Sequence, residues 1–527
     1  MKISKTYITV AALAATIGLA SCDDYLDKQP DSRMDLETPS DVSKLLVTTY
    51  PAVHPAYMLE VYSDNSDCNI NTGWESNGRL EEQAFNWEDI TEDGNEAPST
   101  MWTLHYATVT NANVALQHIY SQSEEAQKEY DSQKGEALLC RAYAIFQLAN
   151  MFCQAYDETT ADTDLGLPFP EKPETNVHGQ YSRGTLAQLY ARLAADIEEG
   201  VRLVNGATYS KPKYHFNSQA ACAFAARFFL YYHKYDKAIE YADKVLGDNP
   251  KEQLRDWRAW SQLTGNGQVA PSAYVSSSLK ANLLLQTVVS EWGVICGPYA
   301  LGEKYSHSAF INNYETTNSE GPWGKTSEAL GNVLFFNSSS SKYCTRKIPF
   351  DMEYSDIQAG IGYPHSTFAV FTTDETLMVR AEAKAMLGRY RDAVDDLNIE
   401  LSAMSLTGAQ LTLDDIKTFY SDSKTKYYTP TNPTPRKMLH TAFAIEQTTQ
   451  EPLLQCILHL RRILTIHEGM RMQDVKRYGI TIYRRTVRSN YKITEVTDTM
   501  EARDPRLAFQ LPQDAITAGL QPNPRNK

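Results

Sequence analysis

Residues 217–246, NSQAACAFAARFFLYYHKYDKAIEYADKVL, predict two helices separated by a short turn. Apolar residues recur at three- and four-residue steps on both sides of a break near His233. Small residues around Ala225 in the first half and Ala238 in the second allow two antiparallel helices to approach closely. We expect Tyr235 to pack at the turn between them. The segment therefore predicts a helical hairpin.

A second segment, residues 373–401, repeats this pattern. RAEAK at residues 380–384 leads through Gly388 and Tyr390 to Ala393, with the aromatic residue again three positions before an alanine. The two hairpins resemble tetratricopeptide helix pairs. Ala238 and Ala393 are 155 residues apart, whereas a regular solenoid of this type repeats every ~34 residues. We therefore expect dispersed hairpins that form a rigid scaffold and a partner surface.

Four further segments show the period of a helix, and they are separated by long irregular stretches. Ser182 and Thr185 are expected to open the third of these segments. The predicted fold is mainly α, with a helix-hairpin scaffold and long insertions of loops and short strands. Because long aromatic-rich loops in compact proteins are usually functional, we expect a binding site on the insertions. The helical segments are 98–120, 124–152, 186–204 and 451–468, and the irregular stretches are 63–97, 157–183 and 251–372.

Composition argues against a nucleic-acid-binding protein and against a protein with several membrane spans. The chain has 527 residues, of which 42% are apolar and 22% are charged, and its net charge is −15. Nucleic-acid binding needs clustered cations, so nucleic acid is not an expected partner. A mean hydropathy of −0.44 leaves room for at most one membrane segment.

The N-terminus predicts an exported lipoprotein. Lys2 and Lys5 precede an uncharged apolar run over 7–19, which is too short to span a bilayer but suits a signal peptide. The run ends in Leu-Ala-Ser-Cys, which resembles the bacterial lipoprotein box. We expect residues 1–21 to be removed and Cys22 to carry the lipid anchor. The alternative is an ordinary signal peptide beside an unrelated cysteine.

Both ends of the mature chain resemble the SusD/RagB family. The opening Cys-Asp-Asp-Tyr-Leu-Asp, residues 22–27, is the first match. Residues 468–479, EGMRMQDVKRYG, are similar to the C-terminal signature of the family, although Leu464 stands where a glutamate is usual. Glu468, Arg471 and Asp474 lie three residues apart, so we expect them to brace one helical surface.

This resemblance implies a SusD-like fold over residues 22–527 as one unit. We expect an N-terminal helical part over 22–250, a loop-rich ligand-binding insertion over 251–372, and a C-terminal helical part over 373–527. The resemblance also implies a function. Family members are surface-exposed outer-membrane lipoproteins that capture glycans for a SusC-like TonB-dependent transporter. The expected partners are thus an oligosaccharide, that transporter, and the outer membrane through the lipid, with the protein on the extracellular face.

Aromatic residues in the irregular stretches are the candidate glycan contacts. A sugar presents flat patches of C–H groups edged by hydroxyls, and an exposed ring flanked by planar polar groups matches it. The alternative for each aromatic is packing within its own loop, and Trp102 is expected to be structural because it lies on a helical stripe. The candidates are Trp74, Trp292, Trp323, Tyr299 and Tyr314, with Asn71, Asn313 and Arg79 as polar contacts.

No catalytic or metal motif is found. Gly324-Lys325-Thr326 ends like a phosphate-binding loop, but Ser319 stands where that loop needs a glycine. The cysteines after Cys22 are odd in number and contain no C-x-x-C pair, which favours buried free thiols, with one disulfide left open. We therefore expect a protein that is not an enzyme and has no cofactor or metal. The alternative function is a surface lipoprotein that binds peptide or another nutrient, or an adaptor that grips proteins through its helix hairpins.

Overall fold

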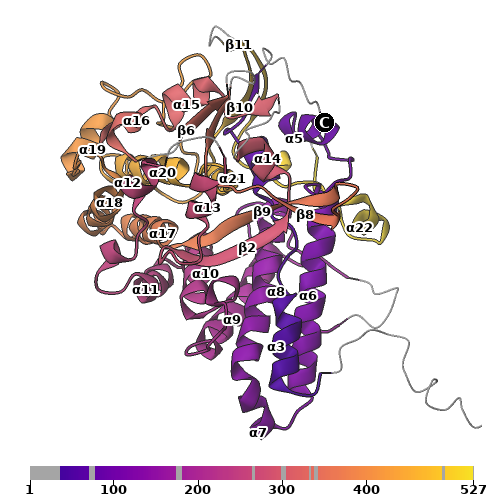
Figure 1. Ribbon diagram of the computed structural model, residues 1–527. Helices are drawn as coiled ribbons and strands as arrows, with labels where there is room; N and C mark the ends of the chain where they lie inside the picture. The colour runs from indigo at the N-terminus through magenta and orange to yellow at the C-terminus, as the bar shows by residue number, and fades with distance from the viewer. Residues whose placement is uncertain are drawn as a thin grey trace, which may run out of the picture.

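The computed structural model describes residues 36–69, 78–173, 181–263, 267–297, 304–331, 334–337, 342–488 and 493–525. Helices dominate, which confirms the predicted mainly α fold (Figure 1). The main helices are α6 (Pro98–Tyr120), α8 (Asp131–Phe152), α9 (Leu186–Leu203), α10 (Ser218–Tyr231), α11 (Tyr235–Leu246), α17 (Thr373–Met386), α18 (Tyr390–Met404), α20 (Gln450–Leu464) and α21 (Arg471–Tyr478).

The two predicted hairpins are α10–α11 and α17–α18. Asn217 caps α10 by accepting hydrogen bonds from the backbone of Gln219 and Ala220, and Thr372 caps α17 through the backbone N–H of Glu375. Gly388 turns the second hairpin with a φ of +74°. The first hairpin has no glycine at its turn, where His233 takes a left-handed φ of +58°.

The two hairpins pack directly on each other although 155 residues separate Ala238 from Ala393. Helix α11 lies against α17, so the array runs without interruption from α6 through α8, α9, α10, α11 and α17 to α18. Figure 1 shows α10 and α11 beside α17 and α18 on one side of the molecule. The chain between the hairpins leaves this array and returns to it, so the repeats are dispersed in sequence but adjacent in space.

Glycines let α8 and α9 approach closely. A Cβ at Gly135 would lie 2.8 Å from the Cβ of Leu203, and a Cβ at Gly200 would lie 2.7 Å from the Cγ of Leu139. Real Cβ atoms do not come this close to their neighbours without a shift. The array therefore depends on both glycines at this crossing.

Two predicted helix boundaries are wrong. The segment 124–152 is interrupted by α7 (Glu124–Gln127) and a 3-10 turn at Lys128–Tyr130 before α8 begins. Thr185 alone caps α9, with Gln188 closing a capping box, and Ser182 takes no part in the cap.

Short strands and short helices form the rest of the fold. β2 (Asn282–Val289), β9 (Ile361–Thr372) and β8 (Asp351–Asp356) form an antiparallel sheet, which Figure 1 shows above α6, α8, α9 and α10. A second sheet has the order β11-β10-β1-β3, from Ile493–Met500, Ile482–Val487, Asp67–Asn69 and Tyr305–Ser306. Two further hairpins pair β4 (Glu320–Gly321) with β5 (Gly324–Lys325) and β6 (Leu334–Asn337) with β7 (Lys342–Thr345). The predicted insertion thus contains most of the strands.

The C-terminal signature braces remote parts of the fold, not one helical surface as we expected. Arg471 pairs with Asp64 (Nε–Oδ1 2.7 Å), and Asp474 accepts a hydrogen bond from Arg461 (Nε–Oδ2 3.1 Å). Glu468 lies before α21 begins and pairs with Lys347 (3.0 Å). The signature, residues 468–479, is therefore tied to three other regions of the chain.

Glu382 of the second hairpin lies at the centre of one such brace. Arg461, Arg477 and the hydroxyl of Tyr478 all donate to its buried carboxylate. Burial alone would raise the pKa of Glu382, but the two guanidinium groups lower it to about 2. The helix array and the C-terminal signature are thus locked together by one carboxylate.

Acid should unfold this protein over a defined pH range. Burial raises the pKa values of Glu315 and Glu382, but the neighbouring cations lower them more strongly. The pKa of each carboxyl therefore falls from 4.5 to about 2. A lowered folded-state pKa gives stability that is complete above the unfolded-state pKa and is lost as pH falls toward the folded-state value. Each group then contributes about 3 kcal/mol that disappears between pH 4.5 and 2.

The measurement is urea unfolding at intervals from pH 7 to pH 2.5. Glu60 and Glu96 do not offset the loss in that window, because burial raises their pKa values to about 7 and about 8. Those raised values lower stability only as pH rises above 4.5. A free energy of unfolding that stays constant from pH 4.5 to 2.5 would contradict the ion-pair assignment.

Candidate ligand-binding site

An open polar cleft lies beside the helix that carries two of the predicted site residues. Its walls come from α15 (Ala309–Glu315), β4, the end of α19 (Leu413–Phe419), and the loops 422–426 and 432–435. The cavity volume is about 560 Å³, within the range of ~300–1,000 Å³ that is usual for ligand sites. The lining residues are Asn313, Tyr314, Glu320, Phe419, Asp422, Ser423, Lys424, Thr425, Lys426, Asn432, Pro433, Thr434 and Pro435.

Tyr314 presents an aromatic face in this cleft. Its side chain is 48% exposed, and its ring is held at 4.9 Å from that of Phe310, one turn earlier in α15. Tyr314 thus combines exposure with a supported orientation, as ring stacking on a sugar requires.

Asn313 lies next to this ring and has hydrogen-bonding capacity to spare. Its side-chain oxygen accepts from the amides of Asn312 (3.2 Å) and Asn318 (2.8 Å). Its own NH₂ group has no acceptor among the described residues, so it is available to a ligand hydroxyl. The cleft therefore joins an exposed ring to a planar polar group.

The facing loop is polar and mixed in charge. Lys424, Lys426 and Glu320 are exposed, and Asp422 is held by Arg436 (2.7 Å). Sequence reasoning missed this wall, residues 422–435. Its Ser, Thr, Asn and Pro content marks a surface loop, but only the tertiary structure places the loop opposite Tyr314.

Buried charges hold α15 in place. Ser308 caps the helix and donates to Asp67 (2.6 Å), and Glu315 at its other end pairs with Lys437 (2.6 Å). Glu315 also pairs with Arg462 (3.1 Å) and Arg485 (2.9 Å). Burial alone would raise the pKa of Glu315, but Lys437, Arg485 and Arg462 lower it to about 2. The exposed ring of Tyr314 therefore stands next to a fully ionised, buried anchor.

Trp292 and Trp323 do not present exposed rings, contrary to our expectation. Trp292 is 6% exposed, stacks on Tyr57 at 4.6 Å and donates its indole N–H to the carbonyl of His467 (2.8 Å). Trp323 is 5% exposed and donates to the hydroxyl of Thr326 (3.0 Å). Both are core residues.

The glycines beside these tryptophans explain the error. Glycines beside a tryptophan suggest an open loop, but a Cβ at Gly293 would strike the carbonyl of Pro349, and a Cβ at Gly321 would strike the ring of Trp323. These glycines are present because the backbone packs closely there. They favour burial of the neighbouring indoles.

Of the remaining predicted residues, the structure describes only Arg79, which does not line the cleft. Arg79 begins α5 (Arg79–Phe85), is exposed and pairs with Glu92 (3.0 Å). The predicted lipid anchor Cys22, the predicted signal peptide 1–21, and Asn71, Trp74 and Tyr299 lie outside the described residues.

Described residues next to two of these segments adjoin each other at one sheet edge. Asn69, which ends β1 and precedes the segment with Asn71 and Trp74, donates its backbone N–H to the carbonyl of Lys304 (2.9 Å). Lys304 follows the segment that carries Tyr299.

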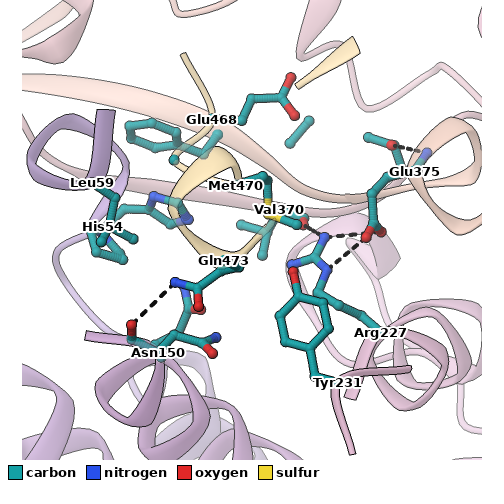
Figure 2. Close-up of a pocket in the computed structure, with 16 residues that line it drawn as sticks. His54, Leu59, Asn150, Arg227, Tyr231, Val370, Glu375, Glu468, Met470 and Gln473 are labelled. Atoms are coloured by element: carbon teal, nitrogen blue, oxygen red, sulfur yellow. Dashed lines mark hydrogen bonds and ion pairs between the residues drawn. The ribbon is translucent and has the colours of Figure 1, made fainter. Parts of the chain in front are cut away.

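A second cavity, at the centre of the fold, is too small for a sugar. Figure 2 shows it lined by His54, Tyr231 and Gln473, with Arg227 between the carboxylate of Glu375 and the carbonyl of Val370. Its volume of about 40 Å³ has room for about three water molecules. The cavity therefore belongs to the polar interior.

The described part of the chain holds no cluster of metal-binding side chains. Among the described residues, no group of three or more His, Cys, Asp and Glu side chains is arranged to hold a metal ion. The seven cysteines from Cys68 to Cys456 are buried free thiols, as predicted.

Comparison with known proteins finds a family model that matches the N-terminal part of the chain. A SusD-like family model, described as "Starch-binding associating with outer membrane", matches residues 24–230. No curated protein matches the sequence. None of the helices in the described part of the chain combines the length and apolar character of a membrane span.

Solved structures share the fold over most of the chain. A SusD superfamily protein from Bacteroides thetaiotaomicron is 18% identical, covers 93% of this chain and 100% of its own, and gives a TM-score of 0.62. A putative sugar binding protein from Bacteroides vulgatus is also 18% identical, with coverages of 93% and 99% and a TM-score of 0.63. A SusD-like carbohydrate binding protein from the same organism is 16% identical, with coverages of 92% and 97% and a TM-score of 0.57. Residues 24–230 therefore match the SusD-like family model, and the chain as a whole shares the fold of SusD-like structures.

Proposed function

We propose that this protein is a glycan-binding lipoprotein of the outer membrane. It is anchored through Cys22, faces the extracellular side, and captures oligosaccharides without changing them chemically. It then passes them to a SusC-like TonB-dependent transporter. Support comes from the family description, which names starch and the outer membrane, and from two similar structures whose names specify sugar or carbohydrate binding.

The cleft at α15 is the observation that carries the binding function. It has the volume of a ligand site, an exposed ring at Tyr314, and a free amide at Asn313. Sugar recognition needs this pairing of a flat apolar face with planar hydrogen-bonding groups. Trp74, Asn71 and Tyr299, with Arg79 as a polar contact, remain predicted contacts.

Substitution Tyr314→Ala tests the cleft. Affinity electrophoresis in gels that contain one polysaccharide each, beginning with soluble starch, should show retardation of the unaltered protein. Loss of the ring should raise the apparent Kd by about tenfold, because an aromatic contact of this kind contributes ~0.5–1.5 kcal/mol beyond its buried area. Tyr354→Ala is the matched control, because Tyr354 is 52% exposed on β8 and outside the cleft.

Two results would count against this proposal in different ways. Equal retardation of the Tyr314→Ala variant and the unaltered protein would remove the cleft as the site. No retardation of the unaltered protein by any polysaccharide would remove the glycan function itself.

A further inference from the structure

A second cleft, lined by aromatic side chains, lies on the opposite side of the molecule. Trp102, Tyr106 and Thr110 follow one another at four-residue steps along α6, so they share one face of that helix. Pro168, Pro170, Lys172 and Tyr181 form a second wall, and Ala515 of α22 (Gln513–Thr517), Ala518 and Leu520 form a third. The cavity volume is about 330 Å³.

This cleft is separate from the cleft at α15. The two share no lining residue. Figure 1 shows α6 and α22 on one side of the molecule and α15 and α19 on the other. A ligand in one cleft therefore makes no contact with the walls of the other.

The indole N–H of Trp102 has no acceptor among the described residues. The other tryptophans of the described chain each donate to a protein acceptor, at distances of 2.8–3.0 Å. Those donors are Trp87, Trp257, Trp260, Trp292 and Trp323. Trp102 thus differs from them in having its donor available, and it lines an open cleft.

The rings in this cleft are held in place before any ligand binds. The hydroxyl of Tyr106 donates to the carbonyl of Pro168 (2.9 Å), which ties α6 to the second wall. Trp102 packs edge-on against Phe152 at 5.3 Å, and its ring lies 4.8 Å from that of Tyr106 at 54°. Fixed rings lose little conformational entropy on binding, which favours a ligand site.

The chemistry of the walls favours an uncharged ligand. No Asp or Glu is among the lining residues, and Lys172 is the one cation. Tyr181 is 42% exposed and adds a third ring. Inclined rings beside a free N–H donor suit a molecule with flat C–H faces and hydroxyl acceptors.

We propose that this cleft binds one pyranose ring of a neutral glycan, with the ring stacked on Trp102 and a hydroxyl oxygen accepting from its indole N–H. The inference rests on the proposed glycan-binding function and adds a second contact site to it. When two sites of the protein bind the same glycan chain, binding at one site raises the effective concentration of the chain at the other. Each site can therefore bind weakly.

The test follows the indole N–H signals by ¹⁵N NMR during titration with methyl glycosides of neutral hexoses. The chain has seven tryptophans, and Trp102→Phe identifies the Trp102 signal by its loss. We expect this signal to shift with a Kd on the order of millimolar, as is usual for a single small ring. In the Tyr314→Ala variant the shift should be the same, because Tyr314 lies in the other cleft.

Tyr181→Ala tests the cleft without removing the reporter. We expect it to raise the Kd measured at Trp102 by about fivefold, because one wall ring is lost. Tyr120→Ala is the matched control, since Tyr120 is also exposed and lies on α6 outside the cleft, and it should leave the Kd unchanged.

Three outcomes overturn the proposal. One is that no glycoside moves the Trp102 signal while Tyr314-dependent retardation by polysaccharide persists; the second site then falls and the proposed function stands. Another is that neither assay detects sugar, in which case both fall. The last is that a proline-rich peptide moves the signal and no glycoside does, because aromatic grooves also bind such peptides.

Discussion

Replacing Glu315 by alanine is expected to lower the free energy of unfolding by about 3–5 kcal/mol, because removal of one partner leaves buried charges unpaired. Lys437, Arg462 and Arg485 all pair with this carboxylate inside the protein. Each cation would then lose a buried partner that water cannot replace. Urea unfolding at pH 7 measures the loss.

Two variants serve as controls for Glu315. Glu315→Gln keeps the shape of the side chain and should show a smaller loss. Glu328→Ala removes an exposed carboxylate paired with Lys325 (2.8 Å) and should change stability by less than ~0.5 kcal/mol. A Glu315→Ala variant that is as stable as the Glu328→Ala variant would show that the cluster at α15 is not held by this carboxylate.

Trp292→Ala is expected to lower the free energy of unfolding by about 3–5 kcal/mol, the usual cost of removing a large aromatic side chain from a core. The indole stacks on Tyr57 and donates its N–H to the carbonyl of His467. The substitution removes this donor and leaves the carbonyl unpaired. Trp292→Phe should cost less, because it retains most of the packing. The measurement is again urea unfolding.

This prediction separates a core role from a binding role. Tyr314→Ala removes an exposed ring and should leave stability within ~0.5 kcal/mol of the unaltered protein. If Trp292→Ala kept full stability and abolished retardation by polysaccharide, the indole would be a ligand contact, as the sequence first suggested.

Local sequence patterns predicted the helices well because helix formation depends on neighbours three and four residues away. The break at His233 and the turn at Gly388 both appear where the pattern predicts them. The break at 128–130 was not predicted, because nothing in the apolar period marks it. Of the predicted site residues that the structure describes, Asn313 and Tyr314 line the α15 cleft, while Trp292 and Trp323 are buried.

Burial of an aromatic ring cannot be derived from its local sequence. Trp292 and Trp102 show this in opposite directions. Trp292 lies beside a glycine in an irregular stretch of sequence, but its ring packs on Tyr57, 235 residues earlier in the chain. Trp102 lies on the apolar stripe of a helix, but it lines an open cleft. In both cases the surroundings come from distant segments.

The sequence by itself determined the helical hairpins, the lipoprotein-like N-terminus and the family resemblance, because each depends on residues close together in the chain. Only the tertiary structure decided that α11 packs on α17, that Glu382 joins the C-terminal signature to the helix array, and which rings face a cleft. The physical reason is that long-range packing and buried charge pairing depend on which distant segments meet. Local periodicity does not predict which segments those are.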